Sequence, residues 1–317
     1  MTLGRLLVTL VVICGMASGA SAAWPEKPVK LVVPYPAGGA ADLPARVVAD
    51  GLQRKFGKPF IVENRAGAAG QVGTESVVRS APDGYTFYCG PNSPIVLLPL
   101  LRPTNYKASD LMPVAPYGEL VYAFGVLKAA PYNNLKELVA YEKVNPGKLT
   151  YSSPGVGSAT HLRGEAFNML AGVQITHIPY RTGAEALPDL LAGRLDMMID
   201  NLFFQQVRLG QVKMLGVISG RRHPEFPDVA TFAEQGYPIE PLRVWGGLHA
   251  PLGTPQPIID ALAKAMNELN VEPETIERML KIGFVTFTAT TAELARQMAD
   301  ETETYRMWVD RTKLKLE

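Results

Sequence analysis

The chain alternates short apolar runs with longer segments whose apolar residues recur at helical spacing. Residues 29–33, 60–62 and 85–89 are short, rich in β-branched or aromatic residues and bounded by Pro or Gly, which predicts strands. Between the first two, apolar residues of segment 43–56 recur every three or four positions, and Gly57 ends the predicted helix. This alternation predicts an α/β fold with parallel sheets covered by helices.

The remainder of the chain repeats this pattern and becomes mostly helical near its end. We expect further strands at residues 148–152, 175–178, 196–199, 213–219, 244–249 and 284–287. We expect further helices after Gly157, before Gly193, and at residues 73–79, 257–269, 274–281 and 292–311. A length of 317 residues favours two lobes of ordinary size over one.

The first 23 residues have the pattern of a secretory signal peptide. Arg5 precedes an apolar run at 6–16, and small residues offer cleavage near Ala22 or Ala23. The run is too short to span a bilayer, so we expect export to the periplasm and removal of residues 1–23. Removal leaves Cys89 without a disulfide partner, and we interpret it as a buried hydrophobe.

Charge and motif content exclude several classes of function. Without the predicted signal peptide, 30 basic residues face 30 acidic ones, so we expect no nucleic-acid partner. We expect no cofactor, because Gly155-x-Gly157-x-x-Thr160 lacks the last glycine of a dinucleotide fingerprint. We expect no metal site, because the histidines are scattered at positions 161, 177, 223 and 249.

Two Gly-rich loops each lead from a predicted strand into a predicted helix. Unpaired backbone N–H groups and the positive end of the helix dipole meet at such a place, which favours anion binding. The first loop contains no Lys or Arg, so its main chain would bind the anion, at Tyr35, Ala37, Gly38, Gly39, Ala40 and Ala41. The second offers hydroxyls and backbone donors at Ser153, Gly155, Gly157, Ser158, Thr160 and His161. Ordinary turn and cap chemistry is the alternative for the second loop.

Asp42 and Arg181 each have two interpretations. Asp42 either caps the following helix and orders the first loop, or contacts a ligand group such as an ammonium. An ionised Asp42 that faced a carboxylate directly would repel it. Arg181 follows Tyr180 at the end of a predicted strand, where it either binds a second carboxylate or lies at the surface.

Three further positions follow predicted strands and are candidates for the ligand site. Asp200 either lines the site or caps the next helix. Asn92 and Ser93 follow the strand that contains Cys89, and both are candidate contacts. Trp245 either walls the site or lies in the core.

Several motifs together resemble one family. They include LVVPYPAGG at 31–39, VENRAGAAG at 62–70, APDGYT at 81–86, HIPYR at 177–181 and APLGTP at 250–255. Their order and spacing, from Trp24 to the C-terminus, resemble the substrate-binding proteins of tripartite tricarboxylate transporters, the Bug (TctC-like) family. Ala40 and Ala41 depart from the Gly/Ser-Thr pair common in that family, which removes a hydroxyl from the first loop.

The resemblance implies a two-lobed periplasmic binding protein of type II, a Venus-flytrap fold. It implies a first lobe of residues 24–123 and 244–317, a second of residues 124–243, and crossovers near 122–126 and 240–244. It implies a small carboxylate held between the lobes with the help of ordered water, and no catalysed reaction. The implied partners of a monomeric protein are the membrane subunits of a transporter; a membrane sensor kinase is the alternative.

A hydrolase is the remaining rival from another class. Ser153, His161 and Asp189 supply the residue types of a catalytic triad, but the chain contains no G-x-S-x-G motif. The sequence leaves the ligand open among dicarboxylates, tricarboxylates, amino acids, aromatic acids and nicotinate-like molecules.

Overall fold

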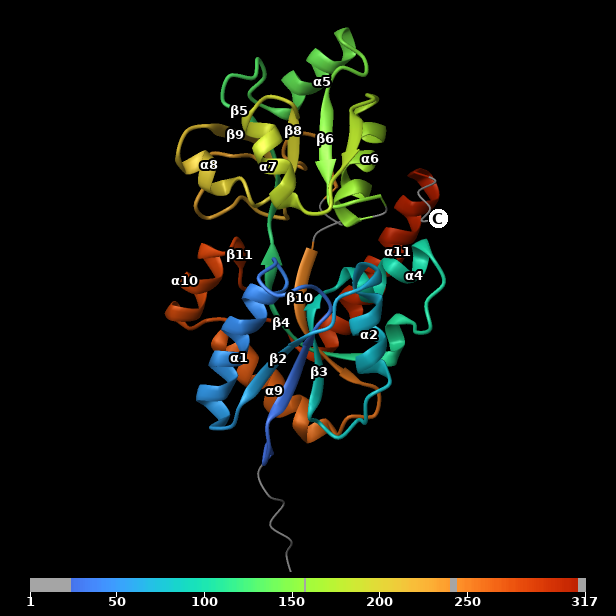
Figure 1. The fold of residues 1–317 in the computed structure, drawn as a ribbon, viewed down its shortest axis with the longest axis vertical. Coiled ribbons are helices and arrows are strands. Elements are labelled where there is room, and N and C mark those ends of the chain that lie inside the picture. The colour runs from blue at the N-terminus through green and yellow to red at the C-terminus, as the bar shows by residue number, and fades with distance from the viewer. Residues whose placement is uncertain (1–23, 157, 240–243, 313–317) are drawn as a thin grey trace, which may run out of the picture.

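The computed structural model describes residues 24–156, 158–239 and 244–312, and it forms two α/β lobes, one above the other in Figure 1. The lower lobe contains a six-stranded sheet in the order β11-β4-β10-β3-β1-β2, and the upper lobe a five-stranded sheet in the order β7-β6-β8-β5-β9. The predicted α/β class and two-lobed fold are confirmed.

The first sheet takes strands from both ends of the chain. Its strands are β1 (Val29–Val33), β2 (Phe60–Asn64), β3 (Thr86–Pro91), β4 (Leu111–Leu120), β10 (Val244–Pro251) and β11 (Phe284–Val285). The accompanying helices are α1 (Asp42–Phe56), η1 (Ala68–Gly70), α2 (Gln71–Val78), α3 (Ser93–Val96), α4 (Leu98–Leu101), η2 (Ala108–Asp110), α9 (Gln256–Leu269), α10 (Pro273–Lys281) and α11 (Thr291–Thr312).

The second sheet takes its strands from the middle of the chain. They are β5 (Tyr122–Leu127), β6 (Thr150–Ser153), β7 (Thr176–Pro179), β8 (Met197–Asp200) and β9 (Val212–Ile218). The helices in this stretch are α5 (Leu135–Val144), α6 (Ala159–Ala171), α7 (Gly183–Leu191) and α8 (Phe204–Arg208).

Both sheets are mixed, so the prediction of parallel sheets is wrong in part. β1 runs parallel to β2 and β3, and β6 runs parallel to β7 and β8. β10 is antiparallel to β3 and β4, and β5 is antiparallel to β8 and β9. β11 is antiparallel to β4 as well.

The chain passes from the first sheet to the second at Val121. β4 ends at Leu120 and β5 begins at Tyr122, so the chain crosses directly before the residues 122–126 near which the crossover was expected, and those residues belong to β5. Residues 240–243, at the second expected crossover, lie outside the described residues. The lobe boundaries expected at 123/124 and 243/244 stay a prediction.

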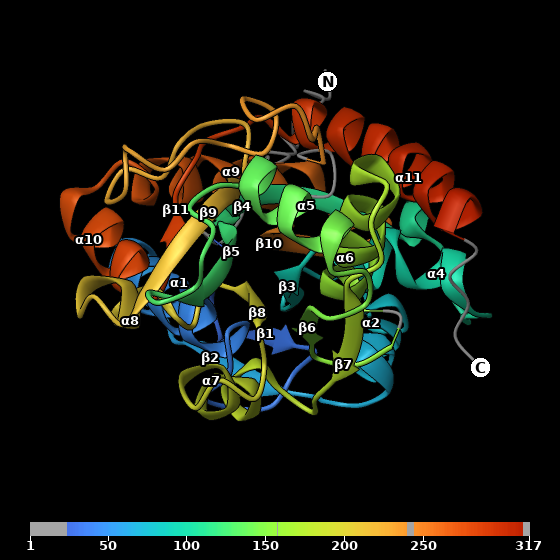
Figure 2. The same cartoon turned by 90° about the horizontal axis from the view of Figure 1, so that it is seen from above.

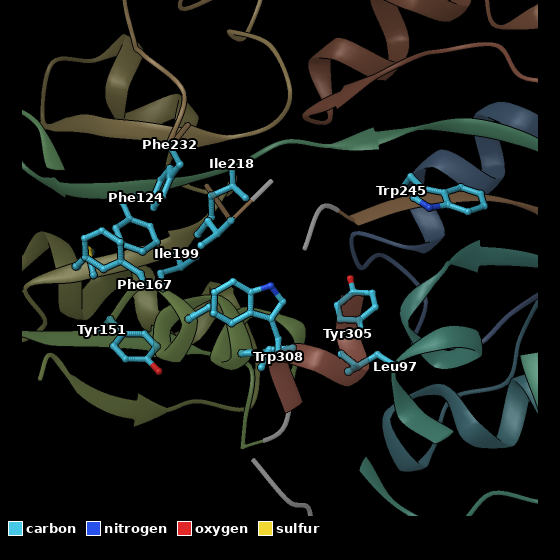
Figure 3. Close-up of a cluster of buried hydrophobic side chains, with 14 of the residues drawn as sticks. Leu97, Phe124, Tyr151, Phe167, Ile199, Ile218, Phe232, Trp245, Tyr305 and Trp308 are labelled. Carbon is cyan, nitrogen blue, oxygen red and sulfur yellow. The ribbon is translucent and has the colours of Figure 1, made fainter. Parts of the chain in front are cut away.

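Helix α11 contacts both lobes. It packs on α3, α4 and β4 of the first lobe and on α6 of the second, and Figure 2 shows it along one side of the molecule. One continuous buried cluster therefore joins Leu97 and Tyr305 to Tyr151 and Phe167, with Trp308 between them in Figure 3.

Candidate functional site

The two sheets face each other with the carboxyl ends of their parallel strands. The single residue Val121 links β4 to β5, so the end of β4 and the start of β5 lie at facing edges. Antiparallel pairing places the end of β3 beside the start of β10 and the end of β8 beside the start of β5. The loops after β1, β2, β3, β6, β7 and β8 therefore meet between the lobes, where open α/β sheets bind ligands.

Asp42 holds the first loop (residues 34–41) from inside. Its carboxylate accepts hydrogen bonds from Gly38 N (2.9 Å), from Arg46 Nε (2.8 Å) and from Asn64 Nδ2 (2.9 Å). The side chain is fully covered, and both oxygens are engaged. Asp42 thus orders the loop, as one interpretation expected, but the N-cap residue of α1 is Ala41, so the predicted N-cap position is wrong.

The partners of Asp42 keep it ionised. Burial is the largest single influence and acts to raise its pKa, but Arg46, Gly38 N–H and Asn64 together outweigh burial and lower the pKa. A covered carboxylate with these partners is not available to a ligand ammonium. The structure therefore favours the structural interpretation of Asp42 over direct contact.

The first loop keeps free donors next to Asp42. Gly39 O accepts from the N–H groups of Asp42 and Leu43, so these two amides are used inside the helix start. Among the described residues, no acceptor meets the N–H groups of Gly39, Ala40 and Ala41. These amides lie before a 15-residue helix, at its positive end.

Tyr35 anchors the same loop. Its hydroxyl donates to Ala69 O (3.2 Å), and its ring contacts Gly70. Burial raises the pKa of Tyr35 to about 12, against an opposing hydrogen bond from Ser93, so the phenol is neutral. Ser93 therefore lies beside Tyr35 at the end of β3. Ala37 and Ala40 are exposed.

The second loop (residues 154–158) ends in a capped helix. Ser158 is the N-cap of α6, and its hydroxyl accepts from His161 N (3.1 Å). The N–H groups of Ala159 and Thr160 have no acceptor among the described residues. The Thr160 side chain hydrogen-bonds Tyr122, the first residue of β5. Gly157 lies outside the described residues.

A cluster of rings supports the second loop. The Ser153 hydroxyl donates to Gly155 O (2.9 Å) and lies 2.7 Å from His177 Nε2. The ring of His177 stacks on that of His161, with 3.9 Å between centroids. Burial lowers the pKa of both histidines to about 4, and for His177 the charge of His161 adds to this while Glu165 opposes it.

The ends of β7 and β8 differ in accessibility. The Tyr180 hydroxyl donates to Asp189 Oδ2 (2.9 Å), so it is directed toward α7. Arg181 is exposed. Asp200 Oδ1 accepts a hydrogen bond from Asn201 N (2.7 Å) within its own turn. Burial raises the pKa of Asp200 to about 6, although backbone hydrogen bonds and the charge of Arg163 act to lower it.

Asn92 and Trp245 point into the first lobe. Both are fully buried, and both donate to Glu301 of α11, Asn92 Nδ2 at 2.6 Å and Trp245 Nε1 at 2.8 Å. Trp245 is therefore a core residue, and the Nδ2 group of Asn92 is engaged by α11. Cys89 is buried without a disulfide, as predicted, and burial raises the pKa of its thiol.

Three groups near these loops were not among the predicted site residues. His177 was considered only among the scattered histidines, and Tyr122 and Arg163 were not singled out. Arg163 is fully buried in α6 and stacks over the Tyr122 ring at 4.6 Å. A fully apolar helical face would not contain an arginine, and that anomaly at position 163 was the available signal.

The triad of the rival hydrolase is not assembled. Asp189 accepts from Tyr180 and pairs with Arg194, and Ser153 meets His177 instead of His161. In the described ranges, His, Cys, Asp and Glu side chains do not gather in threes in a way that suits a metal. None of the helices in those ranges combines the length and apolar run that a membrane crossing needs.

Comparisons with known proteins agree on one family. The model of the tripartite tricarboxylate transporter family receptor matches residues 44–314. Protein BugT of Bordetella pertussis is 34% identical over 325 residues and covers 100% of both chains. The structure of R. palustris Rpa4515 with adipate aligns with a TM-score of 0.81 at 28% identity, over 92% of this chain and 99% of that one.

A second solved structure agrees with the first. MatC (Rpa3494) of Rhodopseudomonas palustris, with bound malate, aligns with a TM-score of 0.76 at 28% identity, over 90% of this chain and 100% of that one. The family match spans both lobes and the second loop, and the alignment with BugT covers the whole chain, the first loop included. The chain therefore belongs to the tripartite tricarboxylate transporter receptor family of periplasmic solute-binding proteins.

Proposed function

We propose that the protein captures a small carboxylate between its two lobes and delivers it to the membrane subunits of a tripartite tricarboxylate-type transporter. The observation that carries the proposal is the pair of helix starts with free N–H groups, one on each facing edge. Gly39, Ala40 and Ala41 supply the first, and Ala159 and Thr160 the second. The adipate bound by Rpa4515 and the malate bound by MatC support the ligand class.

The chemistry of this site suits an anion without a charged partner. The first loop contains no Lys or Arg, so donors come from the main chain and from the positive ends of α1 and α6. Water molecules would bridge the ligand to these loops, which costs little compared with direct bonds. Arg181, exposed just before α7, stays a candidate for a second carboxylate of the ligand.

We assign the protein no catalysed reaction. The Ser153 proton is directed at Gly155 O, and no carboxylate among the described residues hydrogen-bonds His177 to orient it as a base. A receptor of this kind acts in the periplasm, so residues 1–23 would be removed during export. We propose that it works as a monomer that alternates between ligand-free and ligand-bound forms.

A thermal-shift screen with carboxylates tests the function, because a ligand that binds only the folded state raises the melting temperature. The decisive variant is Gly39→Glu, which places a negative charge at the first helix start. A Cβ atom at Gly39 would meet only Pro36 O at 3.4 Å, so the variant should fold. The matched control is Ala129→Glu, in the exposed turn after β5 at the far end of the second lobe.

We expect Gly39→Glu to weaken binding at least about 100-fold, about 2.7 kcal/mol, while Ala129→Glu binds like the wild type. The thermal shift by adipate or malate should disappear in the first variant and persist in the second. An undiminished shift in Gly39→Glu would remove the first loop from the binding site.

A further inference from the structure

The ring cluster under α6 is connected to the second loop by the hydroxyl of Ser153. Parallel pairing aligns Tyr151 with His177 and Ser153 with Pro179, so these side chains share one face of the sheet. On that face the rings of Tyr151, His177 and His161 follow one another, with centroids 5.1 and 3.9 Å apart. Ser153 joins this column to the loop at Gly155.

The two hydrogen bonds of Ser153 determine which ring nitrogen of His177 carries the proton. A carbonyl oxygen only accepts, so the Ser153 hydroxyl donates its single proton to Gly155 O. The contact with His177 at 2.7 Å is then a bond in which Nε2–H donates to the hydroxyl oxygen. His177 thereby fixes the rotamer of Ser153, and Ser153 fixes the carbonyl of Gly155, whose φ of +111° only glycine adopts readily.

The charges around the stacked rings of His161 and His177 favour a proton on one of the two rings but not on both. Glu165 of α6 accepts from the Tyr151 hydroxyl (2.7 Å) and lies 4.0 Å from His161 Nε2. Arg311 of α11 lines the same surface hollow as Glu165, at the outer side of the helix. His161 is the more deeply covered of the two stacked rings, and a charge on one disfavours a charge on the other.

We propose that His177 is a positioning residue for the second ligand loop and that it gains a proton when an anion binds there. This inference rests on the proposed function. The stacked His161 lies in the first turn of α6, next to the N–H groups of Ala159 and Thr160 that would hold the anion. An anion at that place stabilises the positive form of His177, which can still donate from Nε2 to Ser153.

The direction of the pH effect follows from linkage. Burial and His161 keep the pKa of His177 at about 4 in the free protein, and a bound anion raises it. Affinity therefore increases as the pH falls through the pKa of the bound form, and it levels off below about 4. Each pKa unit of difference corresponds to about a tenfold change in affinity.

Two variants separate the hydrogen bond from the charge. His177→Gln keeps a donor near the Nε2 position but cannot ionise, and His177→Phe keeps a stacking ring but has no donor. We expect the affinity for adipate at pH 7.5 to fall at least about tenfold in His177→Phe and to stay within about threefold in His177→Gln, by isothermal titration calorimetry. Equal affinity of His177→Phe and the wild type would overturn the positioning role.

The pH profile tests the proton. From pH 7.5 to pH 5 the affinity of the wild type for adipate should rise at least about fivefold relative to His177→Gln. The ionisation of adipate itself is common to both proteins and cancels in this ratio. Equal pH profiles of the two proteins, with binding still sensitive to Gly39→Glu, would overturn the proton uptake and leave the proposed function intact.

A measurement on the free protein needs no ligand. Nitrogen-15 NMR of the imidazoles at pH 7.5 should report the Nε2–H tautomer for His177. The Nδ1–H tautomer would contradict the hydrogen-bond chain to Gly155 and overturn the positioning role. Failure of the proposed function has a different signature, in which neither adipate nor malate shifts the melting temperature of the wild type.

Discussion

Asp42 ties the first loop to its neighbouring elements. It accepts four hydrogen bonds, one from Gly38 N, two from Arg46 and one from Asn64. These bonds join the loop, the first turn of α1 and the end of β2. Because the carboxylate is fully covered, its loss would leave the Gly38 amide and the Asn64 amide without this acceptor.

We expect Asp42→Ala to lower the free energy of unfolding by about 2 kcal/mol and to weaken ligand binding as well. Asp50→Ala is the control on the same helix, because Asp50 pairs with Arg278 at the surface and such pairs contribute under about 1 kcal/mol. Urea unfolding at pH 7 measures both variants. If Asp42→Ala costs no more than Asp50→Ala, the loop has another anchor.

Residue types alone predicted the loops but not the state of each group. Gly38 and Gly39 look equivalent in sequence, yet Gly38 N–H donates to Asp42, whereas Gly39 N–H meets no acceptor in the part of the chain that the structure describes. His177 was undervalued because its partner Ser153 lies 24 positions away, on the neighbouring strand. Pairing of this kind depends on strand register, which a single sequence does not specify for short strands.

At the scale of elements, prediction succeeded where the local signal was strong. β1 was predicted at residues 29–33 and occupies Val29–Val33, because β-branched residues end at a proline. β4 was missed because Pro113 and Pro116 interrupt its pattern. Those prolines are tolerated because β11 pairs only with Glu119 and Leu120, so at Pro113 and Pro116 the described residues place a neighbouring strand on only one side of β4.

Two glycines inside helices test how closely each helix approaches its neighbours. A Cβ atom at Gly164 of α6 would lie 2.2 Å from the Tyr151 ring, whereas one at Gly51 of α1 would meet only the mobile end of Leu269 at 2.7 Å. Alanine gains about 0.5–1 kcal/mol of helix propensity at either site. We expect Gly164→Ala to destabilise by about 2 kcal/mol and Gly51→Ala to be nearly neutral in urea unfolding.

The difference in stability between Gly164→Ala and Gly51→Ala reports how tightly α6 packs on its sheet. Overpacking at Gly164 displaces Tyr151, the base of the ring column, whereas the Leu269 side chain can rotate away. A Gly164→Ala protein as stable as the wild type would mean that α6 can slide on its sheet. The ring column would then be less rigid than the positioning role of His177 requires.

At the scale of the whole molecule, α11 is a third connection between the lobes. Glu301 ties its middle to Trp245 and Asn92 of the first lobe. About two helical turns after Glu301, Trp308 lies in the buried cluster that includes Tyr151 of the second lobe. The family resemblance implied a place for this helix in the first lobe; its periodicity identifies a buried face but not which lobe covers that face.

Truncation of Trp308 should weaken the coupling between the lobes. The side chain is 4% exposed, so Trp308→Ala removes buried ring area and leaves a cavity, at a cost of about 3 kcal/mol. We expect urea unfolding to change from one transition to two, because each lobe keeps its own sheet and core. Small-angle scattering of the ligand-free variant should show a larger radius of gyration.

Met307→Ala, at the neighbouring position but 40% exposed, is the control and should match the wild type in both measurements. A single transition with an unchanged radius would mean that the two crossovers alone couple the lobes, and that α11 only covers the first one.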